Sequence, residues 1–147
     1  MGTVVVGLDG SEASQLAFAE AVRQAQWRDG AVRAVHVYPY PVSTPYQMTV
    51  IDPEVYRRAA TEWMARELDS LEERYEGRFP VEVDSTVAAG HSGVVLVDAA
   101  RDADVLVLGS RGLGGFRGLL LGSVTTYCVH HLSCPVLVVP APASDDT

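Results

Sequence analysis

The stretch Ala103-Asp104-Val105-Leu106-Val107-Leu108-Gly109-Ser110-Arg111-Gly112, followed nine residues later by Gly122-Ser123, decides the fold class of this 147-residue chain. The apolar run before Gly109 predicts a buried strand, and a helical segment begins near Ser123. Glycines let a backbone approach an anion closely, and a helix N-terminus offers unpaired N–H groups with a partial positive charge. The loop between strand and helix is therefore a candidate anion site. Ser123 and Thr125 add hydroxyl donors to it, and Arg111 and Arg117 add positive charge.

The rest of the chain repeats the strand–helix order around this unit. Short β-branched runs alternate with amphipathic segments, which is typical of a parallel sheet with helices on both faces. We expect a Rossmann-like three-layer α/β fold, whose ligands bind beyond the carboxyl ends of the strands where the strand order reverses. The predicted strands are 3–8, 31–38, 81–88, 104–108 and 135–139, and the predicted helices are 11–28, 52–75, 92–101 and 123–132.

The glycine loop differs from two common phosphate-binding motifs. A Walker A loop needs a lysine after its second glycine, and all eleven basic residues of this chain are arginines. A dinucleotide fingerprint would place G-x-G-x-x-G after the first strand, whereas that strand is followed by Leu8-Asp9-Gly10-Ser11. Neither motif explains the loop.

The pattern G-x2-G-x9-G-[ST], formed here by Gly109, Gly112, Gly122 and Ser123, resembles the nucleotide-binding signature of the universal stress protein family. The similarity covers residues 2–140, with further matching pieces at 4–11, 103–112, 121–125 and 134–139. It implies five parallel strands in the order 3-2-1-4-5, which would bring Asp9 beside Gly109. It also implies the ATP-binding branch of the family, whose members act as nucleotide-dependent regulators in the stress response.

The resemblance also implies a set of site residues. The aspartate at position 9 would lie by the nucleoside, backbone near Val37 would contact adenine, and the segments 109–112 and 122–125 would hold ribose and phosphates. ATP is the expected ligand, with Mg²⁺ bound only through its phosphates, and no catalytic residue or protein metal ligand is predicted. The full predicted nucleotide site is Gly7, Asp9, Ser11, Val37, Gly109, Ser110, Arg111, Gly112, Arg117, Gly122, Ser123, Val124 and Thr125.

Several residues have simpler interpretations. Gly109 and Gly112 could only close a tight turn, Asp9 could share helix entry with Ser11, and Ser123 could be an ordinary N-cap. Trp27 and Trp63 are interpreted as packing residues, and His36 as a packed or exposed strand residue. The proline-rich loop 39–51 could be a lid over the nucleotide or a partner-binding loop.

Three functions stay open at this point. The first is a nucleotide-dependent regulatory protein. The second is a slow ATP hydrolase or phosphoryl-transfer enzyme, for which the loop lacks an acidic pair for Mg²⁺. The third is a sensor of cyclic AMP or another adenine nucleotide, or an interaction module that binds no nucleotide.

Composition indicates which partners and which cellular compartment to expect for the protein. A net charge of −8 and a pI near 4.8 disfavour nucleic-acid and membrane partners. Two cysteines, Cys128 and Cys134, and the lack of an export signal predict a cytoplasmic protein without a disulfide. The use of arginine alone suggests a GC-rich bacterial genome. We expect one domain over residues 1–140 and a short flexible tail at 141–147.

The last predicted strand indicates self-association. Its residues Val136, Leu137, Val138 and Val139 carry no charge, and an uncharged strand at a sheet edge is a template for pairing. Universal stress proteins cover this edge with a second copy, so the resemblance implies a homodimer through the last strand.

Overall fold

A computed structural model describes residues 2–40, 52–110 and 121–142. Its centre is a five-stranded sheet in which every paired neighbour is parallel. The predicted order 3-2-1-4-5 is confirmed. Across the sheet the strands are β3 (Val83–Ala89), β2 (Ala31–Tyr38), β1 (Thr3–Gly7), β4 (Val105–Gly109) and β5 (Val136–Val139).

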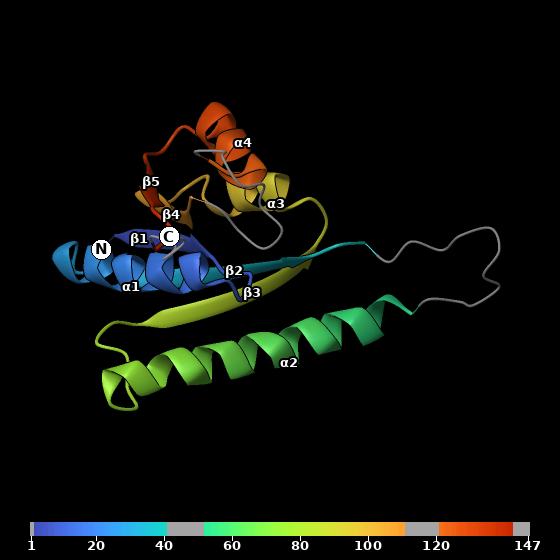
Figure 1. Cartoon of the computed structure of the whole chain (residues 1–147), viewed down its shortest axis with the longest axis horizontal. Helices are drawn as coiled ribbons and strands as arrows, with labels where there is room; N and C mark the ends of the chain where they lie inside the picture. Colours follow the sequence, from blue (N-terminus) through green and yellow to red (C-terminus); the bar gives the residue numbers. More distant parts are fainter. Residues whose placement is uncertain (1, 41–51, 111–120, 143–147) are drawn as a thin grey trace, which may run out of the picture.

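The helices cover both faces of the sheet, as predicted. Figure 1 shows α3 and α4 together on one side, with α2 along β3 on the other side. The core clusters agree, because residues of α1 and α2 share one cluster and residues of α3 and α4 share the other. The helices are α1 (Glu12–Trp27), α2 (Pro53–Glu72), α3 (Ser92–Ala99) and α4 (Ser123–His131).

The apolar runs exist because the central strands are covered on both faces. Val4 and Val6 of β1 belong to the core under α1 and α2, whereas Val5 between them belongs to the core under α3 and α4. All three are fully buried. Each buried valine contributes roughly 1.5–3 kcal/mol of transfer free energy, so this strand fixes the position of both helix layers.

The first two helices begin at residues whose side chains act as N-caps, as the sequence predicts. Ser11 is the N-cap of α1, and its Oγ accepts a hydrogen bond from the Ser14 N–H at 3.1 Å. Asp52 caps α2 in the same way, accepting from the Glu54 N–H at 3.0 Å, and Pro53 follows it. Proline suits the first helical position because its missing N–H would have no partner there.

Element ends differ from the prediction by a few residues. The α-helical part of α2 ends at Glu72 and continues as the 3₁₀ helix η1 (Glu73–Tyr75). Glu76 then adopts a left-handed conformation with φ 58°, which turns the chain toward β3. Because β3 begins at Val83, the predicted start at residue 81 is two residues early. The α3 helix ends at Ala99, two residues before its predicted end.

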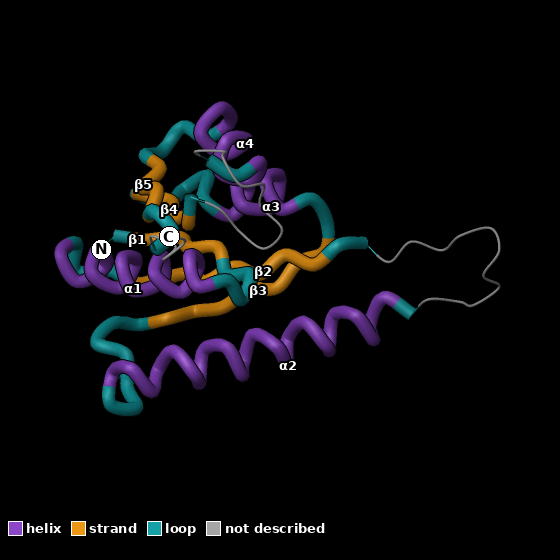
Figure 2. The backbone as a smooth tube through the Cα atoms, viewed as in Figure 1, coloured by secondary structure: helices purple, strands orange, loops and turns teal. Residues whose placement is uncertain are grey.

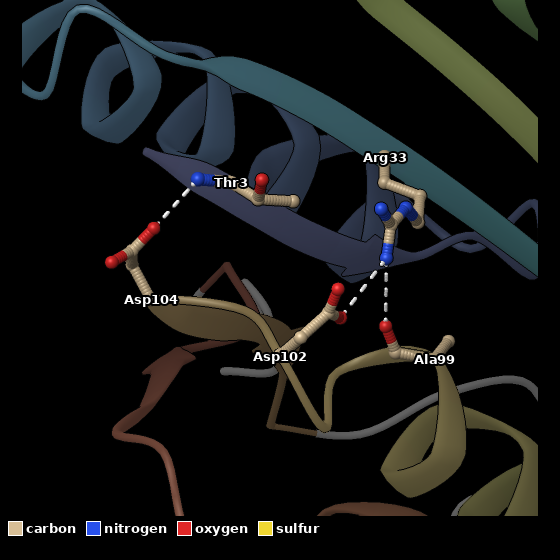
Figure 3. Close-up of polar contacts among 5 residues, drawn as sticks. All are labelled: Thr3, Arg33, Ala99, Asp102 and Asp104. Carbon is tan, nitrogen blue, oxygen red and sulfur yellow. Dashed lines mark hydrogen bonds and ion pairs between the residues drawn. The ribbon is translucent and has the colours of Figure 1, made fainter. Parts of the chain in front are cut away.

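Polar contacts fasten the amino-terminal edge of the sheet (Figure 3). The Thr3 N–H, at the start of β1, donates to the Asp104 carboxylate just before β4, at 2.7 Å. Arg33 of β2 donates to the Ala99 carbonyl at 3.1 Å and contacts the Asp102 carboxylate at 3.5 Å. The exposed ion pair with Asp102 contributes little stability, whereas the hydrogen bond from Arg33 to Ala99 holds the end of α3 against β2.

The two tryptophans lie in different surroundings. Trp63 is partly buried and packs against the core under α1 and α2, as predicted. Trp27 is 68% exposed, with the Arg23 guanidinium 5.2 Å from its ring centroid, so its predicted packing role is wrong. Trp27 is the last residue of α1.

The cysteines are both free thiols. Cys128 is fully buried in the core under α3 and α4, and this burial raises the pKa of its thiol to about 11. Burial also raises the pKa of the Cys134 thiol. Within the described residues, no helix combines the length and the apolar character needed to cross a bilayer.

Candidate functional site

The sheet has its reversal of strand order between β1 and β4. Val6 of β1 is paired with Val107 of β4, while β2 lies on the opposite side of β1. The carboxyl ends of these parallel strands therefore meet at one edge, which is where ligands bind in open α/β sheets. Figure 2 shows that β2 and β3 continue past the end of β1 at this edge.

The turn after β1 is organised around Asp9. Its Oδ1 accepts hydrogen bonds from the Ser11 N–H, at 2.9 Å, and from the Ser11 hydroxyl. The Ser14 hydroxyl donates to the Ser11 carbonyl at 2.9 Å and lies 3.4 Å from the Asp9 N–H. The alternative role of Asp9 in helix entry is therefore correct, and it places the carboxylate at the sheet edge. Sequence analysis did not assign a role to Ser14. Its position three residues after the N-cap Ser11 was the signal that could have indicated its hydrogen bonds in this turn.

Gly109 ends β4 against the first turn of α1. A Cβ at this position would lie 2.9 Å from the Ala13 Cβ and 3.0 Å from its carbonyl carbon, so only glycine permits the approach. Since Ala13 follows the Asp9 turn directly, this contact brings the ends of β1 and β4 together. Asp9 and Gly109 are therefore close because Gly109 packs against Ala13, just after the Asp9 turn.

The chain enters and leaves the glycine loop at the same place. The Gly122 N–H donates to the Ser110 carbonyl at 2.6 Å, and the Thr125 hydroxyl donates to the Gly109 carbonyl at 2.9 Å. Ser110 is buried, and its N–H donates to the Val139 carbonyl at 2.8 Å. The predicted site residues between these anchors, Arg111, Gly112 and Arg117, lie outside the described residues.

The start of α4 leaves backbone donors without a partner in the helix. Gly122, with φ −72° and ψ 166°, is the N-cap and supplies no side-chain acceptor, so the alternative role of Ser123 as N-cap is wrong. The first intrahelical bond runs from the Thr126 N–H to the Gly122 carbonyl at 3.0 Å. The N–H groups of Ser123, Val124 and Thr125 precede it and therefore have no acceptor within α4. Together with the helix dipole, they favour an anion.

Two other predicted site residues, Gly7 and Val37, have their main chain at this edge of the sheet. Gly7 ends β1, and a Cβ there would lie 3.0 Å from the Leu108 Cδ2, so this glycine serves packing. Val37 lies two residues beyond Val35, the β2 partner of Gly7, and thus extends past the end of β1. Its side chain packs on the core under α3 and α4. Val37 can therefore contact a ligand mainly through its main-chain N–H and carbonyl groups.

The hydrogen bond between Thr125 and Gly109 gives a testable stability effect. Thr125 is 3% exposed, so replacing it with valine keeps the shape but removes a buried hydrogen bond. We expect Thr125→Val to lower the free energy of unfolding by about 1 kcal/mol, measured by urea denaturation. Thr126→Val is the matched control, because the neighbouring hydroxyl also bonds a carbonyl, that of Gly122, but is exposed. Equal effects of the two substitutions would contradict the anchoring role of Thr125.

Comparisons with known proteins agree with this geometry. The family model described as "Universal stress protein family" matches residues 1–140. Universal stress protein Rv2624c of Mycobacterium tuberculosis is 35% identical over 99% of this chain, which spans about half of that relative's length (52%). Universal stress protein UspA from Lactobacillus plantarum has a similar structure, with a TM-score of 0.73, 27% identity, and coverage of 94% of this chain and 97% of its own.

A third similar protein was solved with a bound nucleotide. It is a universal stress protein in complex with cAMP, with a TM-score of 0.64, 28% identity, and coverage of 94% of this chain and 96% of its own. The sheet order and the family match over residues 1–140 agree with each other. The chain belongs to the universal stress protein family.

Proposed function

We propose that this protein binds an adenine nucleotide at the carboxyl edge of the sheet, between β1 and β4. The observation that carries this proposal is the convergence of three features at one place. These are the Asp9 turn, the end of β4 at Gly109 and Ser110, and the uncapped start of α4. A protein with a net charge of −8 needs such local donors to hold an anion.

Each feature suits a different part of a nucleotide. The N–H groups of Ser123 and Val124, with the exposed Ser123 hydroxyl, are donors for phosphate oxygens. The Asp9 carboxylate is an acceptor for a ribose hydroxyl or an adenine amine. Backbone near Val37, which continues past the end of β1, is placed to meet the base. Arg111 and Arg117 would add positive charge to the phosphate side.

ATP is the ligand that we propose, with Mg²⁺ held by its phosphates. The donor set consists of backbone N–H groups and a hydroxyl at a helix start, which bind phosphate oxygens, and a triphosphate offers them more negative charge than the single phosphate of cAMP. The similar protein solved with cAMP supports an adenine nucleotide and makes cAMP the competing ligand. Equilibrium dialysis against ATP and cAMP, with GTP as a control, tests the assignment. Saturable binding of ATP, displaced by cAMP only at a large excess, is expected, and equal binding of GTP would contradict it.

The role that follows is regulation by occupancy. Phosphoryl transfer depends on metal-binding carboxylates and a group that orients the nucleophile, and Asp9 is the one carboxylate among the described residues of the predicted site. Its Oδ1 is engaged by Ser11. With excess MgATP, we expect phosphate release far below the roughly 1–100 s⁻¹ of kinases. Turnover in that range would reassign the protein as an enzyme.

We also propose that the protein acts as a homodimer joined through β5. The two edge strands of the sheet differ in a way that favours this choice. At β3 the exposed residues Asp84, Ser85 and Thr86 are polar or charged, whereas the four residues of β5 are uncharged and half-buried. Charges on an edge strand discourage pairing, and their absence leaves β5 as the edge to be covered.

A further inference from the structure

The Asp9 turn is held from the α2 side by two aromatic residues. His36 of β2 and Trp63 of α2 are stacked, with ring centroids 4.1 Å apart and an interplanar angle of 28°. A Cβ at Gly10 would lie 3.1 Å from the Trp63 Cζ2, so the indole covers the backbone next to Asp9. Gly10 has φ +85°, a conformation in which glycine carries no steric cost.

His36 also binds the residue on the other side of Asp9. Its Nδ1 lies 2.8 Å from the Leu8 carbonyl oxygen. Because a carbonyl oxygen can only accept, Nδ1 carries the proton and donates it. The Leu8 N–H donates to the Val35 carbonyl at 2.8 Å. Both backbone groups of Leu8 are thus bound by β2, and the stacked ring of Trp63 holds the imidazole that makes one of these bonds.

The same face of α2 is tied to α1 one helical turn further along. The Gln15 side-chain amide donates to the Glu67 carboxylate at 3.2 Å, and Met64 is buried in the shared core. The position of Trp63 along α2 is therefore fixed by its neighbours. An indole in a fixed position constrains the turn that it covers.

We propose that His36 and Trp63 are positioning residues that hold the Asp9 turn in the geometry needed for nucleotide binding. The inference rests on the proposed function, because it assigns a task to the same site. The pair fixes the backbone on both sides of Asp9, at Leu8 and Gly10, and so fixes where the carboxylate lies relative to the start of α4. Removing the indole loosens the turn in the free protein, and nucleotide binding becomes weaker because the turn must then be ordered when the ligand binds.

The test replaces Trp63 and reads the turn directly. Amide hydrogen exchange in the nucleotide-free protein reports the Ser11 N–H, which donates to the Asp9 Oδ1. We expect Trp63→Leu to speed this exchange about tenfold, the factor for losing one aromatic contact, and to weaken ATP binding by a similar factor. Trp63→Phe keeps an aromatic ring and should restore most of both properties. Trp27→Leu, at the exposed tryptophan, should change neither.

An internal reference separates positioning from a general loss of stability. The amides of Val5 and Leu106 lie in fully buried central strands, where exchange follows global unfolding. Because Trp63 also packs on the core, exchange at these strand amides should rise somewhat, and a larger factor at Ser11 is the expected result. A uniform change at all three amides, or no change at Ser11, would overturn the proposal.

His36 supplies a second route to the same test. His36→Asn keeps a donor near the Nδ1 position but removes the stacked ring, whereas His36→Leu removes both. We expect the loss of affinity and of protection to be larger for leucine than for asparagine, and equal effects would count against the hydrogen bond. If the wild-type protein binds neither ATP nor cAMP, the proposed function fails, while exchange at Ser11 still decides whether the pair holds the turn.

Discussion

Replacing Gly122 with aspartate is expected to abolish ATP binding while leaving the fold intact. The substitution places a carboxylate at the start of α4, where the proposed phosphates would lie. Two like charges about 4 Å apart repel by roughly 4 kcal/mol at an effective dielectric constant of 20, which corresponds to more than a hundredfold loss of affinity. The dissociation constant for ATP, measured by calorimetry, is the readout.

The fold should tolerate this change for a specific reason. Gly122 has φ −72° and ψ 166°, which any residue can adopt, and aspartate is among the best N-cap residues. The melting temperature should therefore stay the same or rise slightly. Ser70→Asp is the control, because it adds the same charge on the exposed surface of α2, between Arg66 and Arg74. Unchanged affinity in Gly122→Asp would remove the start of α4 from the site.

If the protein is the proposed dimer, replacing Val138 with proline is expected to convert it to a monomer. The Pro135 carbonyl accepts a hydrogen bond from Leu106 of β4, and the Val139 carbonyl accepts one from Ser110 just after β4. In the alternating pattern of a parallel ladder, the N–H and carbonyl of Val138 therefore face away from β4. Proline removes that outward N–H and is tolerated on an edge strand. Light scattering at micromolar concentration should show a dimer for the wild type and a monomer for the variant.

Val138→Thr separates backbone pairing from side-chain packing. Threonine keeps both the N–H and the branched shape, so this variant should remain a dimer. Circular dichroism and the melting temperature should show that both variants are folded. A wild-type monomer, or a dimer that survives proline at position 138, would place any association on another surface.

The central elements of the fold could be predicted because β1 and β4 are short apolar runs between helix signals. The three consecutive buried valines of β1, at positions 4–6, predict a strand covered on both faces whatever its neighbours are. Strand order is different, because it is set by contacts between residues far apart in the chain. The pairing of Val6 with Val107 cannot be obtained from either segment alone. Here the order was implied by the family resemblance.

Sequence spacing indicated which residues would lie together at the two ends of the glycine loop, and their use as a nucleotide site stays a prediction. Ser110 and Gly122, on either side of the loop, are joined by a main-chain hydrogen bond. The role of Thr125 was less predictable. Sequence analysis made its hydroxyl a donor in the anion site, whereas the hydroxyl donates to the Gly109 carbonyl. A hydroxyl on the first turn of a helix can point to a ligand or to the protein, and only the packing of α4 against β4 decides which.

The stacked pair of His36 and Trp63 shows what sequence could not reveal. Trp63 was correctly interpreted as packing, whereas His36 was interpreted as a packed or exposed strand residue. Their contact with each other and with the Asp9 turn depends on how α2 lies against β2. The two residues belong to different elements, and no periodic pattern links them. Tertiary contacts of this kind are set by how the helices pack on the sheet and leave no local signal in the sequence.

The most direct test of the proposed site is a titration of the isotope-labelled protein with MgATP, followed by backbone amide chemical shifts. We predict saturable shifts that concentrate on Asp9, Ser110, Gly122, Ser123 and Val124, while the amides at the amino-terminal edge of the sheet, such as that of Thr3, stay unchanged. Absence of shifts at millimolar ATP, or shifts confined to residues away from the ends of β1 and β4, would contradict nucleotide binding at this edge.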